Sequence, residues 1–142
     1  MRHIQAREIA NVAFLTGDYH EFFAGNVMED GRTPGKSLAT EFVGGSITAF
    51  AVPEYFAGGA GSVYPVPGGE AALEPLINGL VDANPHVKYH DSVHHGYGVA
   101  EAGPDELKVE FRAAETTQAP ASRVATLKRM RVLSGVPEVE VL

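Results

Sequence analysis

The chain has 142 residues, 44% of them hydrophobic, a net charge of −7 and no cysteine. A domain of this size can bury a core without disulfides or structural metals, and the lack of cysteine excludes both disulfides and thiolate metal sites. The acidic balance argues against a nucleic-acid-binding patch, which needs a basic face. The one basic cluster, Arg123, Lys128, Arg129 and Arg131, is expected to be a solvated face. There is no transmembrane run and no signal peptide in this chain.

The first half predicts two strands separated by a turn-rich loop. Residues 11–16 form a short apolar run, which is typical of a strand buried on both faces with a loop at its C-terminal end. A second strand is expected at residues 39–43. Gly44 and Gly45 follow it, and the pair indicates a bulge or a close approach of the backbone. Residues 51–69 hold many Gly and Pro residues and are expected to form a long loop.

One clear amphipathic helix follows. Its apolar residues recur at helical spacing and form one stripe, namely Leu73, Leu76, Ile77, Leu80 and Val81. Pro75 is tolerated best in a first turn, so the helix should begin close to it. Asn84 and Pro85 should end it.

The remainder is rich in predicted strands. A short strand is expected at residues 87–90, and a hairpin at 96–101 and 106–112 around the turn of Gly103, Pro104 and Asp105. A further strand should cover residues 124–133, and residues 136–142 form an edge strand or a tail. With no internal repeat or domain boundary, residues 1–142 are expected to be a single α+β domain.

The tetrapeptide from Gly17 to His20 is the first candidate site. In an extended chain Asp18 and His20 project to the same side, here from the end of a buried strand, where open sheets tend to place ligands. Carboxylate and imidazole groups are suitable metal ligands, and glycine before them would allow a sharp turn. Taken alone, the same residues are also compatible with a turn aspartate and a half-exposed histidine.

Other polar residues give weaker signals. Glu41 is either a buried, perturbed carboxylate or a residue on the wet side of its strand. His94 and His95 should point to opposite faces, so they cannot share one ion without a bend. Ser46 has no nucleophile motif around it, and residues 58–61 lack the Lys-Ser/Thr of a phosphate loop. His3, His86 and His90 are expected at the surface.

Several segments together resemble the PhoD-like (alkaline phosphatase D) phosphatases. They are NVAFLTGDYH at 11–20, ATEFVGGSIT at 39–48, ANPHVKY at 83–89 and HGY at 95–97. They occur in the order and at the spacing found in the family. The match covers nearly the whole chain but only the C-terminal third or so of such an enzyme.

The resemblance implies a calcineurin-like metallophosphoesterase fold, of which this chain would be the strand-rich C-terminal part of a two-sheet sandwich. It also implies hydrolysis of phosphate mono- and diesters, iron and calcium as the cofactors, and export from the cytoplasm. Carried onto this sequence, Asp18 and His20 would be metal ligands, one to each ion. Tyr19, Glu41, Ser46 and His95 would be structural or outer positions around them.

The chain departs from the family pattern upstream of Gly17. Motifs of the Gly-Asp-x-x-Asp and Gly-Asn-His type, which supply the other ligands, do not occur. Two ligands cannot hold a dinuclear centre, so we expect a fragment of a longer enzyme, with Met1 an internal or false start. Such a chain should need the missing N-terminal half as its partner and should be inactive alone. A fragment should also leave a strand edge and an apolar surface open.

Two alternatives remain open from the sequence. A stand-alone, non-catalytic α+β binding module would leave no strand edge open. A complete mononuclear metalloenzyme would use Asp18, His20 and a further histidine, and it needs that third ligand within about 2.0–2.5 Å of a shared ion.

Overall fold

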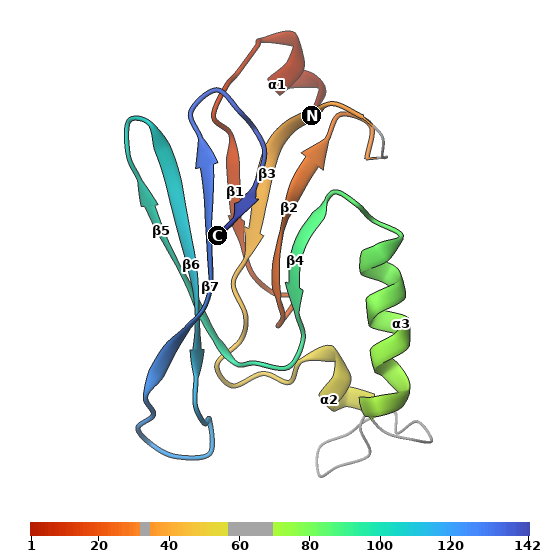
Figure 1. Ribbon diagram of the computed structural model, residues 1–142, viewed down its shortest axis with the longest axis vertical. Helices are drawn as coiled ribbons and strands as arrows, with labels where there is room; N and C mark the ends of the chain where they lie inside the picture. Colours follow the sequence, from red (N-terminus) through yellow and green to blue (C-terminus); the bar gives the residue numbers. More distant parts are fainter. Residues whose placement is uncertain (32–34, 57–69) are drawn as a thin grey trace.

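A computed structural model describes residues 1–31, 35–56 and 70–142 of the chain. Two four-stranded sheets pack face to face, and the helix α3 lies outside the first sheet (Figure 1). The elements are α1 (Arg2–Ala6), β1 (Ala13–Thr16), β2 (Phe22–Met28), β3 (Ser37–Val43), α2 (Val52–Phe56), α3 (Glu70–Asp82), β4 (Val87–Asp91), β5 (Gly96–Ala102), β6 (Glu106–Ala114), β7 (Val124–Leu133) and β8 (Glu140–Val141).

The first sheet is mixed and has the order β1-β3-β2-β4. β1 runs parallel to β3, with Ala13 opposite Thr40, and β2 runs antiparallel to both β3 and β4. The second sheet is an antiparallel meander of the order β5-β6-β7-β8. Within it Val109 of β6 lies opposite Met130 of β7.

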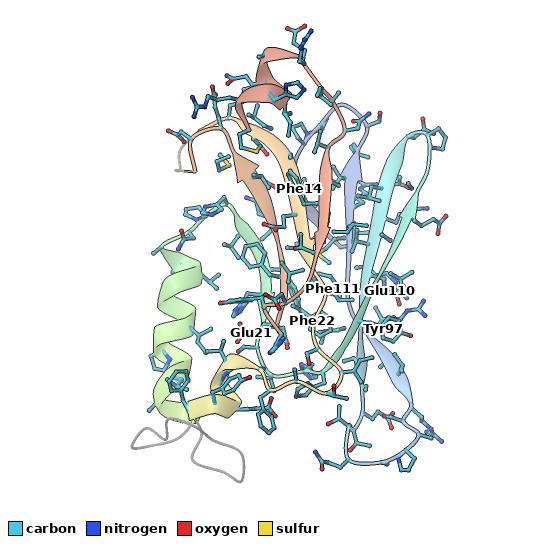
Figure 2. The ribbon with its side chains drawn as sticks, turned by 180° about the vertical axis from the view of Figure 1, so that it is seen from behind. Phe14, Glu21, Phe22, Tyr97, Glu110 and Phe111 are labelled. Carbon is cyan, nitrogen blue, oxygen red and sulfur yellow. The ribbon has the colours of Figure 1, made fainter. Side chains whose placement is uncertain are left out.

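The two sheets share one apolar core. Phe22 of β2 and Phe111 of β6 are almost fully buried, and their ring centroids lie 5.0 Å apart. Figure 2 shows these two side chains between the sheets. Tyr89 of β4 adds a second ring contact to Phe111, at 5.9 Å between centroids. The expected α+β class, with two packed sheets and few helices, is therefore confirmed.

Most of the predicted strands are present. The strands expected at 39–43, 87–90, 96–101, 106–112 and 124–133 correspond to β3, β4, β5, β6 and β7, and the expected edge strand near the C-terminus is β8. The sequence analysis did not predict β2, although it is central in its sheet. It also missed the short helices α1 and α2, the second of which lies in the expected long loop; residues 57–69 of that loop lie outside the described part.

The prediction that the first strand is buried on both faces is wrong for this chain. β1 hydrogen-bonds to β3 on one side, and in the described residues no strand pairs with its other side. Leu15 is 61% exposed, and Phe14 is exposed as well. The apolar run therefore has the composition of an interior strand but lies at the edge of its sheet in the described part of the chain.

The helix start was also placed too late. α3 begins at Glu70, so Pro75 lies inside the helix rather than in its first turn. The residues before the proline are strong helix formers, and they favour the helix despite the lost N–H and the ring clash that a proline brings beyond the first turn. Leu73, Ile77 and Val81 face a cavity against the first sheet. The side chains of Leu76 and Leu80, the rest of the expected stripe, lie outside the described part.

Gly45 confirms the expected close approach after β3. A Cβ built on this residue would lie 2.8 Å from the ring of Phe22, which is fully buried and cannot move aside. Because Gly45 has no side chain, the backbone can pass next to the Phe22 ring as it leaves β3.

A candidate metal-ligand loop between β1 and β2

Asp18, Tyr19 and His20 lie in the bend that joins β1 to β2. The strand ends at Thr16, and both Asp18 and His20 have a left-handed backbone, with φ of 70° and 65°. The extended conformation expected for this tetrapeptide is therefore wrong, and strand alternation does not set its side-chain directions. Gly17 is not the residue that turns: Asp18 and His20 adopt the positive φ angles that glycine usually takes.

Left-handed backbone costs energy for residues with a Cβ, and it persists where the surroundings over-determine it. Two such residues lie within three positions of this loop. Strain of this kind clusters at functional sites. Asp18 is exposed and His20 is partly buried, so neither is sealed in the apolar interior.

His20 is held by a backbone carbonyl from a distant segment. Its Nδ1 lies 2.9 Å from the carbonyl oxygen of Phe50, between β3 and α2. A carbonyl only accepts hydrogen bonds, so Nδ1 carries the proton. In the neutral ring Nε2 then has a free lone pair, which is the form in which a histidine binds a metal through Nε2.

The next residue, Glu21, is a buried carboxylate that the sequence analysis missed. It is 2% exposed; one oxygen lies 2.7 Å from His90 Nε2, and the other accepts a hydrogen bond from the Val52 backbone N–H at 3.1 Å. His90 was expected at the surface but is largely buried in this pair. The only sequence signal was an acidic residue directly before an apolar strand, and its contact with His90 follows from the pairing of β2 with β4, in which Phe23 lies opposite His90.

His95 and Ser46, two of the expected outer residues, lie together. His95 Nδ1 lies 3.1 Å from the Ser46 carbonyl oxygen, and Nε2 lies 3.1 Å from a carboxylate oxygen of Glu54. The Ser46 hydroxyl bonds both the N–H and the carbonyl of Ala49. His94, in contrast, pairs with Asp91, so the two adjacent histidines do face separate partners as expected.

Tyr19 borders a cavity of about 590 Å³ between α2, α3 and the outer face of the first sheet. The walls are mainly apolar, and Glu21 and His90 supply polar groups. Burial, and next the negative charge of Glu21, raise the pKa of the Tyr19 phenol. Tyr19 therefore stays a neutral hydrogen-bonding group beside the loop over the ordinary pH range.

Glu41 lies away from this cluster, on the outer face of β3. It is partly buried and accepts a hydrogen bond from the Thr16 hydroxyl at 3.1 Å across the β1–β3 pair. It is thus neither a fully buried carboxylate nor a fully solvated one. Its contact ties it to the strand that leads into the loop, and it does not contact His95 or Ser46.

The charged outer face of the second sheet is an internally paired network. Arg129 lies 3.5 Å from Glu110 and Arg131 lies 2.6 Å from Glu140, while Arg112 bonds Glu110 at 3.0 Å. Hydrogen bonds from Thr126 and Arg112, together with the nearby positive charges, lower the pKa of Glu110. Each guanidinium of this face already faces a carboxylate.

The donor types at the loop suit a metal ion, but their number is small. Among the described residues, no group of three or more histidine, aspartate or glutamate side chains is arranged to hold an ion. The expected third ligand of a mononuclear site is therefore not found in this part of the chain. The roles of Asp18 and His20 as metal ligands stay a prediction.

A family model described as PhoD-like phosphatase matches residues 1–111, which is most of the chain. The chain belongs to the PhoD-like phosphatase family. Alkaline phosphatase D of Bacillus subtilis (strain 168) is 27% identical over 124 residues, which are 87% of this chain and 18% of that protein. A solved structure of PhoD matches with a TM-score of 0.75 and 21% identity over 99% of this chain and 24% of the other, which supports the fold.

The PhoD-like chain thus spans about a fifth to a quarter of the length of the proteins it matches. The match includes the candidate loop at residues 17–20 and the outer residues Glu41, Ser46 and His95. No helix among the described residues has the length and apolar character needed to span a membrane.

Proposed function

We propose that this chain is the part of a PhoD-like phosphatase that supplies Asp18 and His20 to a metal-dependent site for hydrolysis of phosphate mono- or diesters. The observation that carries the proposal is the His20 ring, whose Nδ1 donates to the Phe50 carbonyl and whose Nε2 is therefore left as a ligand. The exposed Asp18 carboxylate, two residues earlier, supplies a second ligand of a suitable type.

When bound, metal ions neutralise the anionic phosphate, activate water and stabilise the leaving oxygen. The chain's own residues hold and orient the candidate ligand His20. The Phe50 carbonyl fixes the His20 ring, and Glu21 fixes the backbone next to it by binding Val52 N–H. By resemblance the ions are iron and calcium, and the protein acts outside the cytoplasm.

The remaining ligands come, in this proposal, from a further part of the enzyme that packs along β1. Three features support that position. Within residues 1–31, 35–56 and 70–142, no strand pairs with the outer edge of β1 and no group bonds the buried Thr40 hydroxyl, and Leu15 is 61% exposed beside that edge. Thr40 and Leu15 both line a cavity of about 260 Å³ between the sheets. A strand added to β1 would pair its backbone, cover Leu15 and place side chains in this cavity.

A chimaera tests the catalytic part of the proposal. The segment of Bacillus subtilis alkaline phosphatase D that matches this chain is replaced by the chain, and hydrolysis of bis-p-nitrophenyl phosphate and p-nitrophenyl phosphate is measured. We expect Asp18→Asn and His20→Gln to reduce hydrolysis by more than the roughly 10–100-fold that loss of an outer partner of a metal ligand causes. Asp105→Asn and His3→Gln are matched controls, since both residues are exposed and far from the loop in sequence. A chimaera that keeps full activity with both loop variants would contradict the proposal.

The proposed contact along β1 is tested separately. The chain is co-expressed with the remainder of the phosphatase as a separate polypeptide, and co-purification is measured. Leu15→Lys should abolish it, because a charge would be buried in the new contact. Val99→Lys is the control, since Val99 is a partly exposed residue of β5 in the other sheet. Equal co-purification of both variants would contradict a contact along β1.

A further inference from the structure

The segment between β3 and α2 is fixed at both ends by side chains from other elements. At its start, the Ser46 carbonyl accepts hydrogen bonds from His95 Nδ1 and from the Gly96 N–H, at 3.1 and 2.9 Å. At its end, Glu54 faces His95 Nε2 at 3.1 Å and also accepts a hydrogen bond from the Ala51 N–H at 2.7 Å. One imidazole therefore bridges two points eight residues apart.

The residues between these points form a compact turn that presents the Phe50 carbonyl. The Ser46 hydroxyl binds both backbone groups of Ala49, and the Phe50 ring packs edge-on against Tyr55 at 5.9 Å between centroids. On the far side Glu21 accepts from Val52 N–H. The peptide that holds His20 is thus flanked by restrained residues on both sides.

His95 does not contact His20. Its Nδ1 donates to the Ser46 carbonyl, and its Nε2 faces Glu54, to which it donates when the ring is protonated, so both nitrogens are already in contact with protein oxygens. The His95 side chain is largely buried, at 15% exposed, and it lies between Ser46 and Glu54. The geometry of His95 therefore supports an indirect role, in which it acts on His20 through Ser46 and Glu54.

We infer that His95 is a positioning residue: by bridging Ser46 and Glu54 it holds the Phe50 carbonyl in place, and that carbonyl selects the His20 tautomer with the proton on Nδ1 and a lone pair on Nε2. The inference deepens the proposed metal site and rests on it for its functional meaning. The structural claim itself concerns the metal-free chain, because the tautomer is set by the hydrogen bond alone.

The test reads the tautomer directly. The chain is labelled with ¹⁵N-histidine, and long-range ¹H–¹⁵N spectra are recorded above the pH range in which histidine titrates, with His20→Gln used to assign the His20 signals. We expect the Nδ1–H form of His20 to exceed the other by about tenfold, the factor that one net hydrogen bond of usual strength produces. His95→Phe should lose most of this excess, while His95→Gln, which keeps one N–H donor for the Ser46 carbonyl, should retain more of it.

His94→Phe is the matched control, because His94 is the adjacent histidine and bonds Asp91, which lies outside the 46–54 segment. It should leave the His20 tautomer unchanged. Glu54→Ala removes both the acceptor of the Ala51 N–H and the group that faces His95 Nε2, and it should weaken the preference as well, so the test does not depend on His95→Phe folding normally.

Two results would overturn the inference. The first is a wild-type His20 that carries its proton on Nε2. The second is an Nδ1–H preference that survives both His95→Phe and Glu54→Ala in folded protein. Neither result would by itself remove Asp18 and His20 as ligands, which the chimaera tests separately. Conversely, a chimaera insensitive to Asp18→Asn and His20→Gln would remove the metal site while leaving the tautomer measurement intact.

Discussion

The Glu21 carboxylate lies 2.7 Å from His90 Nε2, and this buried pair joins the start of β2 to β4 directly beside the candidate ligand His20. The carboxylate also binds the Val52 N–H, so one side chain connects three elements: β2, β4 and α2. The position of His20 therefore depends on contacts made by its neighbour in the chain as well as on its own.

Glu21→Ala should destabilise the fold by about 2–3 kcal/mol, since it leaves a buried imidazole N–H and a backbone N–H without their acceptor. Urea unfolding measures the change. Glu101→Ala, in the exposed β5–β6 hairpin, is the control and should change stability by no more than about 0.5 kcal/mol. Equal effects of the two substitutions would show that the buried pair contributes nothing.

Gly45→Ala should destabilise by about 1–3 kcal/mol, because the added methyl group overlaps the buried Phe22 ring and neither can move without disturbing the core. Gly17→Ala is the matched control, since a Cβ there meets no atom within 4 Å. Thermal unfolding measures the stability of the two variants. A Gly45 variant as stable as the Gly17 variant would disprove the close approach.

Asp18→Gly should stabilise the isolated chain by about 1 kcal/mol, because it relieves the left-handed backbone at φ 70°. Tyr19→Gly, which replaces a neighbour without a positive φ, should not stabilise it. The midpoints of denaturant unfolding measure the stability of both variants. A stabilised Asp18→Gly chain that also loses activity in the chimaera would show that the strained residue is kept for function; a destabilised one would contradict the strain.

Tyr89 gives a prediction about high pH. Burial, and next the charge of Asp91, raise the pKa of Tyr89 to about 12 from an ordinary value of 10.0. The folded state therefore favours the protonated phenol: this contribution to stability is fully present below pH 10 and is lost as the pH rises toward 12. The free energy of unfolding should fall across that window, and less steeply in Tyr89→Phe. A phenolate absorbance assigned to Tyr89 with a midpoint near 10 would contradict this.

The sequence predicted those features that depend on local pattern. The alternation of Leu107, Val109 and Phe111 gave β6 its inner face, and the apolar spacing from Leu73 gave α3. The sequence did not predict β2, because Phe22 and Phe23 are consecutive aromatics with no alternation, and both of its faces are covered.

The candidate site shows the same division. Asp18 and His20 were identified from residue type and from the resemblance, but their left-handed backbone was not, because neither residue type signals a positive φ in the way that glycine does. The roles of Glu21 and His90 arise from a pairing of β2 with β4 across 69 positions of sequence. No local pattern encodes such a contact.

The most direct measurement of the central claim is a titration of the ¹⁵N-labelled chain with Mn²⁺, a paramagnetic ion that suits carboxylate and imidazole ligands. The claim predicts that amide signals of Asp18, Tyr19 and His20 broaden first, and that Asp18→Asn combined with His20→Gln removes this broadening while Asp105→Asn combined with His3→Gln does not. Broadening that begins at other carboxylates, with the signals of residues 18–20 still sharp, would contradict it.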